Sequence, residues 1–338
     1  GVTKNATYTS GSGSTQLVFR YQIQEGDSDP TDGVTTITPI LLSGGSINQG
    51  SNAALLTFTA ATFAGVLVDG VSPTMTSAVT EDNDGNGQID RITVTFDQAV
   101  NFTDATGAGD ALPGFTLGGG YTLANFDYGT IAGTTIILRV TESGSPDTEV
   151  TPDVVYSRAA GALLDDNGNE AQDETQTSTD GASPVMVSAV TADNDADGQI
   201  DRITLTFSEE VDITDPNGAG DGLPDFTVAG YTIASVDYTL LNTTTLTLQL
   251  TESGTPDTEV TPLVTYDREG DAAENVADNV GNEQRDNDTE TPADGAGPAI
   301  THVTANNDTY IVGENLDFTV TWHEAVTVSG NPVLRLDI

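Results

Sequence analysis

A repeat of about 110 residues organises this chain. Asp69-Gly-Val-Ser-Pro-Thr-Met75 recurs as Asp180-Gly-Ala-Ser-Pro-Val-Met186 and again as Asp294-Gly-Ala-Gly-Pro-Ala-Ile300. The three copies start at residues 69, 180 and 294, which are 111 and 114 residues apart, and this spacing is the length of one small domain. The chain is therefore expected to fold as a row of similar units rather than around one large core.

The residues within each repeat predict strands. Residues 91–96 (Arg-Ile-Thr-Val-Thr-Phe) and 244–250 (Thr-Thr-Leu-Thr-Leu-Gln-Leu) alternate apolar and polar side chains, as half-buried strands do. Gly and Pro separate such runs, and no stretch shows the spacing of an amphipathic helix. With seven or eight strand candidates per repeat, we expect an all-β fold of tandem immunoglobulin-like β-sandwiches, two complete and one split between the two chain ends.

The domain boundaries follow from the repeat. Residues 69–179 and 180–293 match along their length and are predicted to be two immunoglobulin-like domains. Residues 294–338 and 1–68 together number 113, which is one more repeat. We expect residues 294–338 to be the N-terminal part of a split domain and residues 1–68 to be its C-terminal part, supplied by the next copy.

Read in that permuted order, the split unit resembles the repeats of bacterial surface proteins of the biofilm-associated-protein type. The residues that carry the resemblance are Thr309-Tyr-Ile-Val-Gly-Glu-Asn-Leu-Asp-Phe-Thr-Val-Thr-Trp322, Glu324-Ala-Val-Thr-Val-Ser-Gly-Asn-Pro-Val-Leu-Arg-Leu336 and Ala6-Thr-Tyr-Thr-Ser-Gly-Ser-Gly-Ser-Thr-Gln-Leu-Val-Phe19. Residues 69–293 look like more distant immunoglobulin-like repeats of large bacterial adhesins. The resemblance implies a sandwich fold, an extracellular or cell-surface location and an adhesive or matrix role, and it carries over no catalytic residue.

Two arrangements fit a split unit. The chain is one period of a giant tandem-repeat protein, or it is a subunit whose N-terminal piece pairs with the C-terminal strands of the next copy. Open strand edges favour such complementation, and a head-to-tail contact that does not close gives a filament. The first arrangement is slightly favoured, and in both the partners are neighbouring copies of the same repeat.

The charge of the chain excludes several partners. It has 9 Lys and Arg against 52 Asp and Glu, a formal net charge of -43, which repels nucleic acid and anionic membranes. No 18-residue apolar run is present, so no membrane insertion is expected. The acidity indicates either solubility or life in high salt, or the binding of divalent cations. Because there is no Cys, disulfides and thiolate metal sites are excluded.

Two acidic loops begin like the calcium loop of an EF-hand. Oxygen side chains at positions 1, 3 and 5 converge on one cation there, and Gly at position 6 allows the turn. Position 12 is Thr93 or Thr204 instead of Glu, and no helices flank the loops, so the remaining ligands must come from elsewhere in the chain or from water. An Asx-rich polar turn without metal is the alternative. The predicted calcium ligands are Asp82, Asp84, Asn86, Gln88 and Asp90, and Asp193, Asp195, Asp197, Gln199 and Asp201.

A second pair of acidic loops lies late in each repeat. Its additional candidate ligands are Asp165, Asn167 and Asn169, and in the next repeat Asp278 and Asn282; as turn formers, these residues need no metal. We hypothesise that the loop at Asp82 meets the loop near Asp278 across the junction of the two domains and shares a calcium ion that stiffens it. The remaining loop acids are expected to be solvated; they are Asp104, Asp110, Asp215 and Asp221, and Glu142, Asp147, Glu149, Glu252, Asp257 and Glu259.

No constellation for catalysis is found, so the chain is not expected to be an enzyme. It has two His residues, His302 and His323, one Trp and no GxSxG motif. The expected function is an extracellular structural or adhesive segment stiffened by calcium. The alternatives are a module that binds a cell-surface glycan or protein, which an exposed aromatic platform would favour, and an accessory region of a larger secreted hydrolase.

Overall fold

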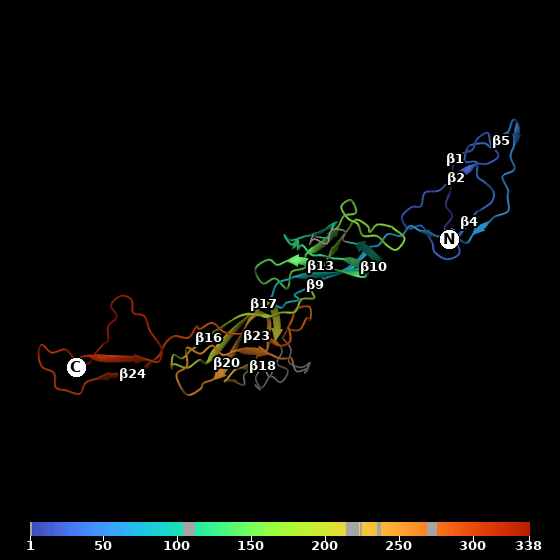
Figure 1. The fold of residues 1–338 in the computed structure, drawn as a ribbon. Coiled ribbons are helices and arrows are strands. Elements are labelled where there is room, and N and C mark those ends of the chain that lie inside the picture. Colours follow the sequence, from blue (N-terminus) through green and yellow to red (C-terminus); the bar gives the residue numbers. More distant parts are fainter. Residues whose placement is uncertain (1, 104–111, 214–222, 224, 235–237, 269–275) are drawn as a thin grey trace.

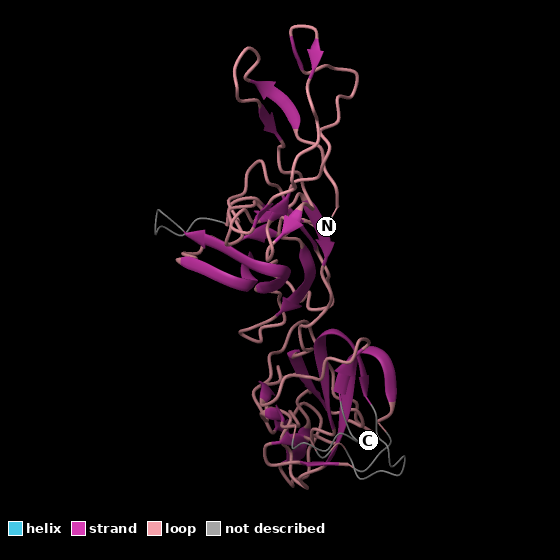
Figure 2. Cartoon of the chain, turned by 90° about the vertical axis from the view of Figure 1, so that its right-hand side faces the viewer, coloured by secondary structure: helices cyan, strands magenta, loops and turns pink. Residues whose placement is uncertain are grey.

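The computed structural model describes residues 2–103, 112–213, 223, 225–234, 238–268 and 276–338. These residues form an elongated chain in which two packed regions lie in the middle and the two terminal segments lie at opposite ends (Figure 1). All the regular secondary structure of the described residues is β-strand (Figure 2). The prediction of an all-β fold is thus confirmed. In the described residues, no helix has the length and apolar character needed to cross a membrane.

The first packed region consists of two antiparallel sheets. The four-stranded sheet has the order β12-β13-β10-β9, and the three-stranded sheet has the order β11-β14-β15. Their strands are β9 (Met75–Glu81), β10 (Arg91–Thr103), β11 (Phe115–Leu117), β12 (Thr122–Leu123), β13 (Thr130–Thr141), β14 (Asp153–Tyr156) and β15 (Glu174–Thr177).

The second packed region repeats this pairing. Its larger sheet has the order β16-β17-β20-β19, with β22 also paired to β17, and its smaller sheet has the order β18-β21-β23. Its strands are β16 (Met186–Ala192), β17 (Arg202–Ile213), β18 (Phe226–Val228), β19 (Thr232–Ile233), β20 (Leu240–Thr251), β21 (Val264–Tyr266), β22 (Val276–Asp278) and β23 (Asp288–Glu290).

Alternation of side chains along the central strands builds one core in each region. Ile92, Val94 and Phe96 of β10 are buried between the two sheets, whereas the intervening residues are partly exposed. Ile203, Leu205 and Phe207 of β17 do the same in the second region. Burial of each such side chain is worth about 1.5–3 kcal/mol. Each core takes side chains from both of its sheets, which is consistent with a β-sandwich.

The chain passes from the first region to the second through residues 178–185, and hydrogen bonds fix this passage. Thr179 pairs with Val79 in a parallel bridge, and Thr80 N–H donates to the Thr179 carbonyl at 3.0 Å. A Cβ atom on Gly181 would lie 2.4 Å from Val79 Cγ1 and 3.0 Å from the Thr80 carbonyl oxygen, so glycine permits this close approach. The passage therefore holds Asp180 against the end of β9.

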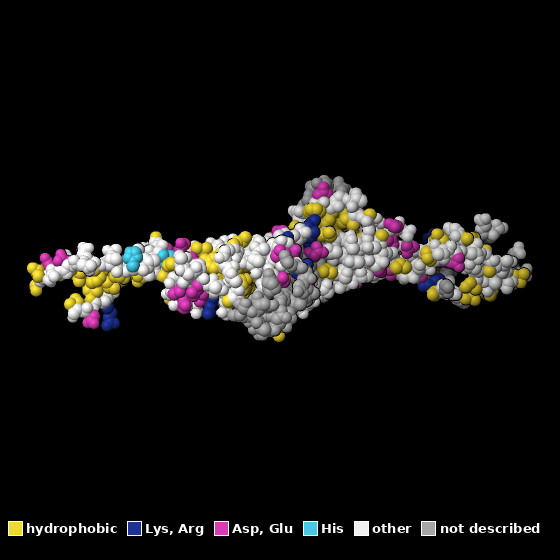
Figure 3. Space-filling model, turned by 90° about the horizontal axis from the view of Figure 1, so that it is seen from below, with side chains coloured by type: hydrophobic (Ala, Val, Ile, Leu, Met, Phe, Trp, Pro, Cys, Tyr) yellow, Lys and Arg dark blue, Asp and Glu magenta, His cyan; other side chains and the backbone are white. Residues whose placement is uncertain are grey.

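In the terminal segments, the described residues form two-stranded pairings and lie outside both cores. The pairs are β1 (Thr7–Ser10) with β2 (Val18–Arg20), β3 (Ser28–Asp29) with β8 (Val68–Asp69), β4 (Val34–Thr35) with β7 (Thr62–Phe63), β5 (Asn48–Gln49) with β6 (Asn52–Ala53), and β24 (Ile300–Ala305) with β25 (Phe318–Trp322). Many of their apolar side chains are exposed; Leu55 and Val333, for example, are 93% and 85% exposed. Figure 3 shows apolar side chains at both ends of the molecule. These segments thus present apolar surface that the described chain does not cover.

Candidate metal centre

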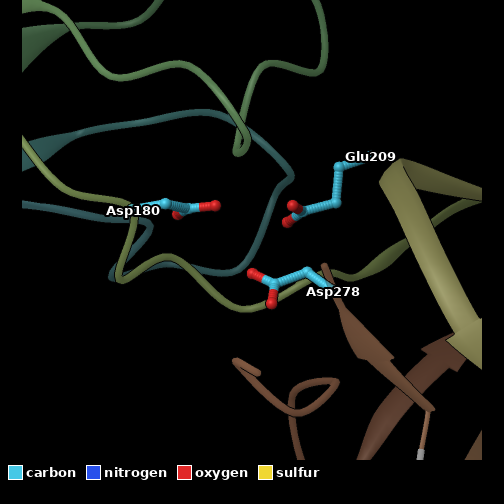
Figure 4. Close-up of side chains that lie close together, drawn as sticks. All are labelled: Asp180, Glu209 and Asp278. Atoms are coloured by element: carbon cyan, nitrogen blue, oxygen red, sulfur yellow. The ribbon is translucent and has the colours of Figure 1, made fainter. Parts of the chain in front are cut away.

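Three carboxylates converge between the two packed regions. Asp180, Glu209 and Asp278 each offer one oxygen, and these three oxygens lie within 4.8 Å of one another. The side chains come from three separate segments and point toward a common centre (Figure 4). Asp180 lies in the passage between the regions, Glu209 lies in β17, and Asp278 ends β22.

Strand pairing explains why Glu209 and Asp278 meet. The register of β17 shifts between Thr206 and Val211, so Glu209 stands in an irregular part of the strand. Beyond this irregularity, Val211 pairs with Asp278 of β22. Asp278 is thus held two positions along the strand from Glu209.

Asp278 is further fixed by its own turn. Its Oδ1 atom accepts the backbone N–H groups of Val280, Gly281 and Asn282 at 2.9, 2.6 and 2.7 Å. Its Oδ2 atom accepts the Asn282 side-chain amide at 2.7 Å. Asn282, a candidate ligand from the sequence, therefore orients Asp278 through this hydrogen bond.

Glu209 is the least satisfied member of the cluster. Its side chain is only 4% exposed, and its Oε1 atom has no hydrogen-bond partner in the described part of the chain. Burying a carboxylate without partners is unfavourable by several kcal/mol. No salt bridge between described residues includes Asp180, Glu209 or Asp278, so their charge lacks a basic side chain to offset it.

The electrostatics of the cluster favour a cation. Burial, with a smaller contribution from the charges of Asp180, Asp278 and Glu149, raises the pKa of Glu209 to about 8, although a hydrogen bond from the Thr148 hydroxyl opposes the shift. Burial also raises the pKa of Asp180 to about 6, with a further contribution from Asp278. A bound divalent cation would reverse both effects, because it stabilises the ionised carboxylates.

The cluster opens into a cavity of about 410 Å³. The first packed region contributes Glu149 and Thr151 to its wall, the passage contributes Thr179 and Asp180, and the second region contributes Glu209, Glu210, Asp278, Asn279 and Val280. Beside it, the Thr148 hydroxyl donates to the Ser208 hydroxyl at 2.8 Å, so the two regions are also hydrogen-bonded directly. A cation held by the three carboxylates would thus lie in a cavity whose wall includes residues of both regions.

The predicted loop at Asp193 also gathers carboxylates. One oxygen each of Asp193, Asp195 and Asp197 lie within 4.8 Å of one another, in an exposed setting. Asp193 already accepts the Ala196 and Gly198 N–H groups at 2.7 and 2.8 Å. Asp201, predicted as a ligand, instead accepts the Asn194 N–H at 3.1 Å. Gln199 turns its side-chain oxygen to the Gly254 N–H.

The matching loop at Asp82 is closed by its own backbone. Asp82 accepts the Gly85 and Gly87 N–H groups at 2.6 and 2.7 Å, and Asp90 accepts that of Asn83 at 3.0 Å. Asn86 stands where the second loop has Asp197, and it donates its amide to Asp84 at 3.2 Å. Within the described residues, this loop does not gather three carboxylates. Gln88 accepts the Gly144 N–H at 2.5 Å.

The sequence led us to expect that the loop at Asp82 meets the loop near Asp278 across the junction, but in the structure Asp278 lies with other carboxylates. The Asp82 loop does contact the second packed region, since Arg285 Nη1 lies 3.4 Å from the Asn83 carbonyl oxygen. In the described chain, however, the carboxylates grouped with Asp278 are those of Asp180 and Glu209. The sequence pattern did not predict Asp180 or Glu209 as ligands, because Asp180 belongs to the repeat motif and Glu209 lies in a strand. The signal that identifies Glu209 is the replacement of Gln98, its counterpart in the first repeat, by an acid.

The other loop candidates differ in their surroundings, and Glu142, Glu149, Glu252 and Glu259 are exposed as expected. Asp165 and Asn169 bond to each other at 2.8 Å, while Asn167 donates to Asp69. Asp147 and Asp257 are buried, contrary to their expected solvation, because they accept the backbone N–H groups of Ile89 and Ile200. Four candidates lie outside the described residues; they are Asp104, Asp110, Asp215 and Asp221.

Comparison of the chain with protein-family models, with curated proteins and with solved structures found no match in any of the three.

Proposed function

We propose that this chain is an extracellular structural or adhesive segment in which a divalent cation stiffens the joint between two immunoglobulin-like units. The observation that carries the proposal is the buried carboxylate of Glu209, which is grouped with those of Asp180 and Asp278 and whose Oε1 atom has no hydrogen-bond partner in the described residues. When all three carboxylates are ionised they repel one another, and a cation that lies between them would offset this repulsion.

Calcium is the cation that fits best. The three candidate ligands are carboxylates, and the Thr and Asn side chains of the cavity wall also offer oxygen atoms, which hard cations prefer. Calcium accepts six to eight oxygens in irregular geometry, whereas magnesium demands near-ideal octahedral geometry. The three protein ligands and the adjoining cavity leave room for water to complete such a shell. The exposed cluster of Asp193, Asp195 and Asp197 would add a second and weaker site.

The terminal segments support a role in a fibre or stalk. Apolar side chains on both strands of the β24–β25 hairpin are exposed, among them Val303 at 48% and Trp322 at 37%. Residues 1–68 expose apolar surface at the opposite end (Figure 3). We propose that residues 294–338 of one repeat pack against residues 1–68 of a neighbouring copy, so that the units continue head to tail. An extracellular or cell-surface location supplies calcium at the concentrations that extracellular modules use.

Calcium titration of the chain tests the proposal. We expect isothermal calorimetry to detect binding, and small-angle X-ray scattering to show a smaller spread of conformations in calcium than in chelator. Asp180→Asn combined with Asp278→Asn should remove the tighter binding event and the stiffening. Asp127→Asn, which changes an exposed acid that is neither in the carboxylate cluster nor in the cavity wall, serves as the matched control. Identical scattering of the wild-type chain in calcium and in chelator would contradict the proposal.

A further inference from the structure

We infer that the two joints of this chain use one geometry with different chemistry: side-chain amides close the first joint without metal, whereas the second joint requires a cation. The first joint is the contact of residues 1–68 with the first packed region around Asp69, and the second joint is the contact around Asp180 described above. This inference rests on the proposed cation site and adds which joint responds to the cation and which residues decide it.

The two joints are built alike at their central aspartates. Asp69 Oδ1 accepts the Val71 N–H at 3.1 Å, and Asp180 Oδ1 accepts the Ala182 N–H at the same distance. In each joint the preceding segment is tied to the passage by backbone hydrogen bonds. Gly26 N–H donates to the Gly70 carbonyl at 2.8 Å, as Thr80 N–H donates to the Thr179 carbonyl at 3.0 Å.

The late loops that face these aspartates are also alike. Asp165 Oδ1 accepts the N–H groups two and four residues later, both at 2.8 Å. Asp278 Oδ1 accepts the corresponding groups at 2.9 and 2.7 Å. The Asn169 and Asn282 amides then hold the Oδ2 atoms at 2.8 and 2.7 Å. The two carboxylates therefore occupy the same place in the same turn.

The first difference between the joints lies two residues after these aspartates. Asn167 donates its side-chain amide to Asp69 Oδ2 at 2.6 Å. The carboxylate of Asp69, which faces the late loop, is therefore hydrogen-bonded to it. Val280 occupies this position in the second joint, with its side chain 69% exposed. Valine has no hydrogen to donate, and Asp180 therefore approaches Asp278 with no donor from this position.

The second difference lies in the central strands. Gln98 and Glu209 each stand two residues after the phenylalanine that ends the regular pairing, Phe96 or Phe207. Gln98 donates its amide to the Val71 carbonyl at 2.8 Å. A carboxylate cannot make that bond, and the Oε1 atom of Glu209 has no hydrogen-bond partner among the residues that the structure describes. The second joint therefore has Glu209 in place of Gln98 and Val280 in place of Asn167. Compared with the first joint, it lacks two amide donors and has one more carboxylate.

The hairpin β24–β25 has a glutamate at the position that corresponds to Gln98 and Glu209, and this glutamate has partners of its own. Glu324 stands two residues after Trp322, and its Oε1 atom accepts the Thr258 hydroxyl at 2.8 Å. His323 Nε2 lies 3.4 Å from Glu259 and 3.6 Å from Glu324. Here the chain itself supplies a hydroxyl and an imidazole next to the glutamate. Of these three places, the second joint is the one whose glutamate oxygen has no partner in the described residues.

A reciprocal exchange tests the inference. Glu209→Gln with Val280→Asn gives the second joint the residues of the first, and Gln98→Glu with Asn167→Val does the converse. Asp193→Asn with Asp195→Asn is present throughout, so that the exposed loop does not bind. Calcium binding is measured by calorimetry. Hydrogen exchange then reports on each joint separately through the Thr80 amide at the second and the Gly26 amide at the first.

We expect the parent chain to bind calcium and to protect the Thr80 amide at least about tenfold better in calcium than in chelator. The first exchange should weaken binding by more than about tenfold and keep Thr80 protected in chelator. The converse exchange should make the Gly26 amide sensitive to chelator. Exchange of the core amides of β10 and β17 reports that each variant is folded.

The outcomes separate the two proposals. A parent chain that binds no calcium would overturn the proposed function and this inference together. If the parent chain binds calcium and the variant with Glu209→Gln and Val280→Asn binds it equally well, this inference alone would be overturned. Calcium protection of Gly26 in the parent chain, or a converse exchange that leaves Gly26 insensitive to chelator, would also overturn it alone.

Discussion

Asn167 donates its side-chain amide to Asp69 Oδ2 over 2.6 Å, across 98 residues of sequence. This hydrogen bond ties the late loop of the first packed region to the start of the same repeat. In the next repeat, the corresponding pair is Val280 and Asp180, and no such bond is possible. Asp180 instead lies beside the carboxylates of Glu209 and Asp278.

Glu209→Gln should stabilise the second packed region when no cation is present. The substitution removes a buried acid whose ionisation is unfavourable and supplies an amide that can donate to the neighbouring backbone, as Gln98 does. We expect a gain of about 1–3 kcal/mol in chelator, measured by urea unfolding, and a loss of the extra stability that calcium gives. Glu142→Gln, at an exposed position, is the control. A variant less stable than wild type in chelator would show that Glu209 has a partner that the inference lacks.

The stability of the second joint should fall as the pH rises when the cation is removed. The pKa values of Glu209 and Asp180 are raised from 4.5 and 3.8 to about 8 and about 6 in the folded chain. Between the unfolded and folded values the folded state binds more protons, so its stability decreases with increasing pH. Thermal unfolding in chelator should show a decreasing melting temperature from about pH 4 to pH 8, and saturating calcium should abolish this slope. A melting temperature in chelator that rises across this window would contradict the site.

Asp147→Ala should destabilise the first packed region whether or not calcium is present. Asp147 accepts the buried Ile89 N–H at 2.8 Å and the Tyr121 hydroxyl at 2.7 Å. Removing the carboxylate leaves the N–H group unpaired, at a cost of about 1–3 kcal/mol. Tyr121→Phe, which keeps the carboxylate, should cost less. Equal losses in the two variants, measured by urea unfolding, would show that the tyrosine bond is as important as the backbone bond.

Val303→Asp should weaken association between copies of the chain. Val303 lies on β24 in an apolar surface that the described chain leaves 48% exposed, and a charge there opposes burial against a neighbour. Sedimentation velocity and electron microscopy should show fewer or shorter assemblies than for the wild-type chain. Thr304→Asp, an exposed change at the next position of the strand, is the matched control. Assembly that resists Val303→Asp would exclude this face as the contact.

The sequence alone predicted the all-β fold because that information is local. Alternation of apolar and polar residues at 91–96 and 244–250 follows the two-residue period of a strand, and these residues lie in β10 and β20. The repeat motif also located Asp180, although as a boundary marker. The acidic loops were identified as turns that could hold a cation, and their Asx geometry is present at Asp82 and Asp193.

Only the tertiary structure decided which carboxylates meet. Asp180, Glu209 and Asp278 are separated by 29 and 69 residues, so no spacing rule brings them together. Their convergence depends on the register shift in β17, on the pairing of β22 with Val211, and on the docking of the passage against β9. Burial then turns three ordinary acids into a cluster that favours a cation, because the cost of an unpaired charge depends on its surroundings and not on its residue type.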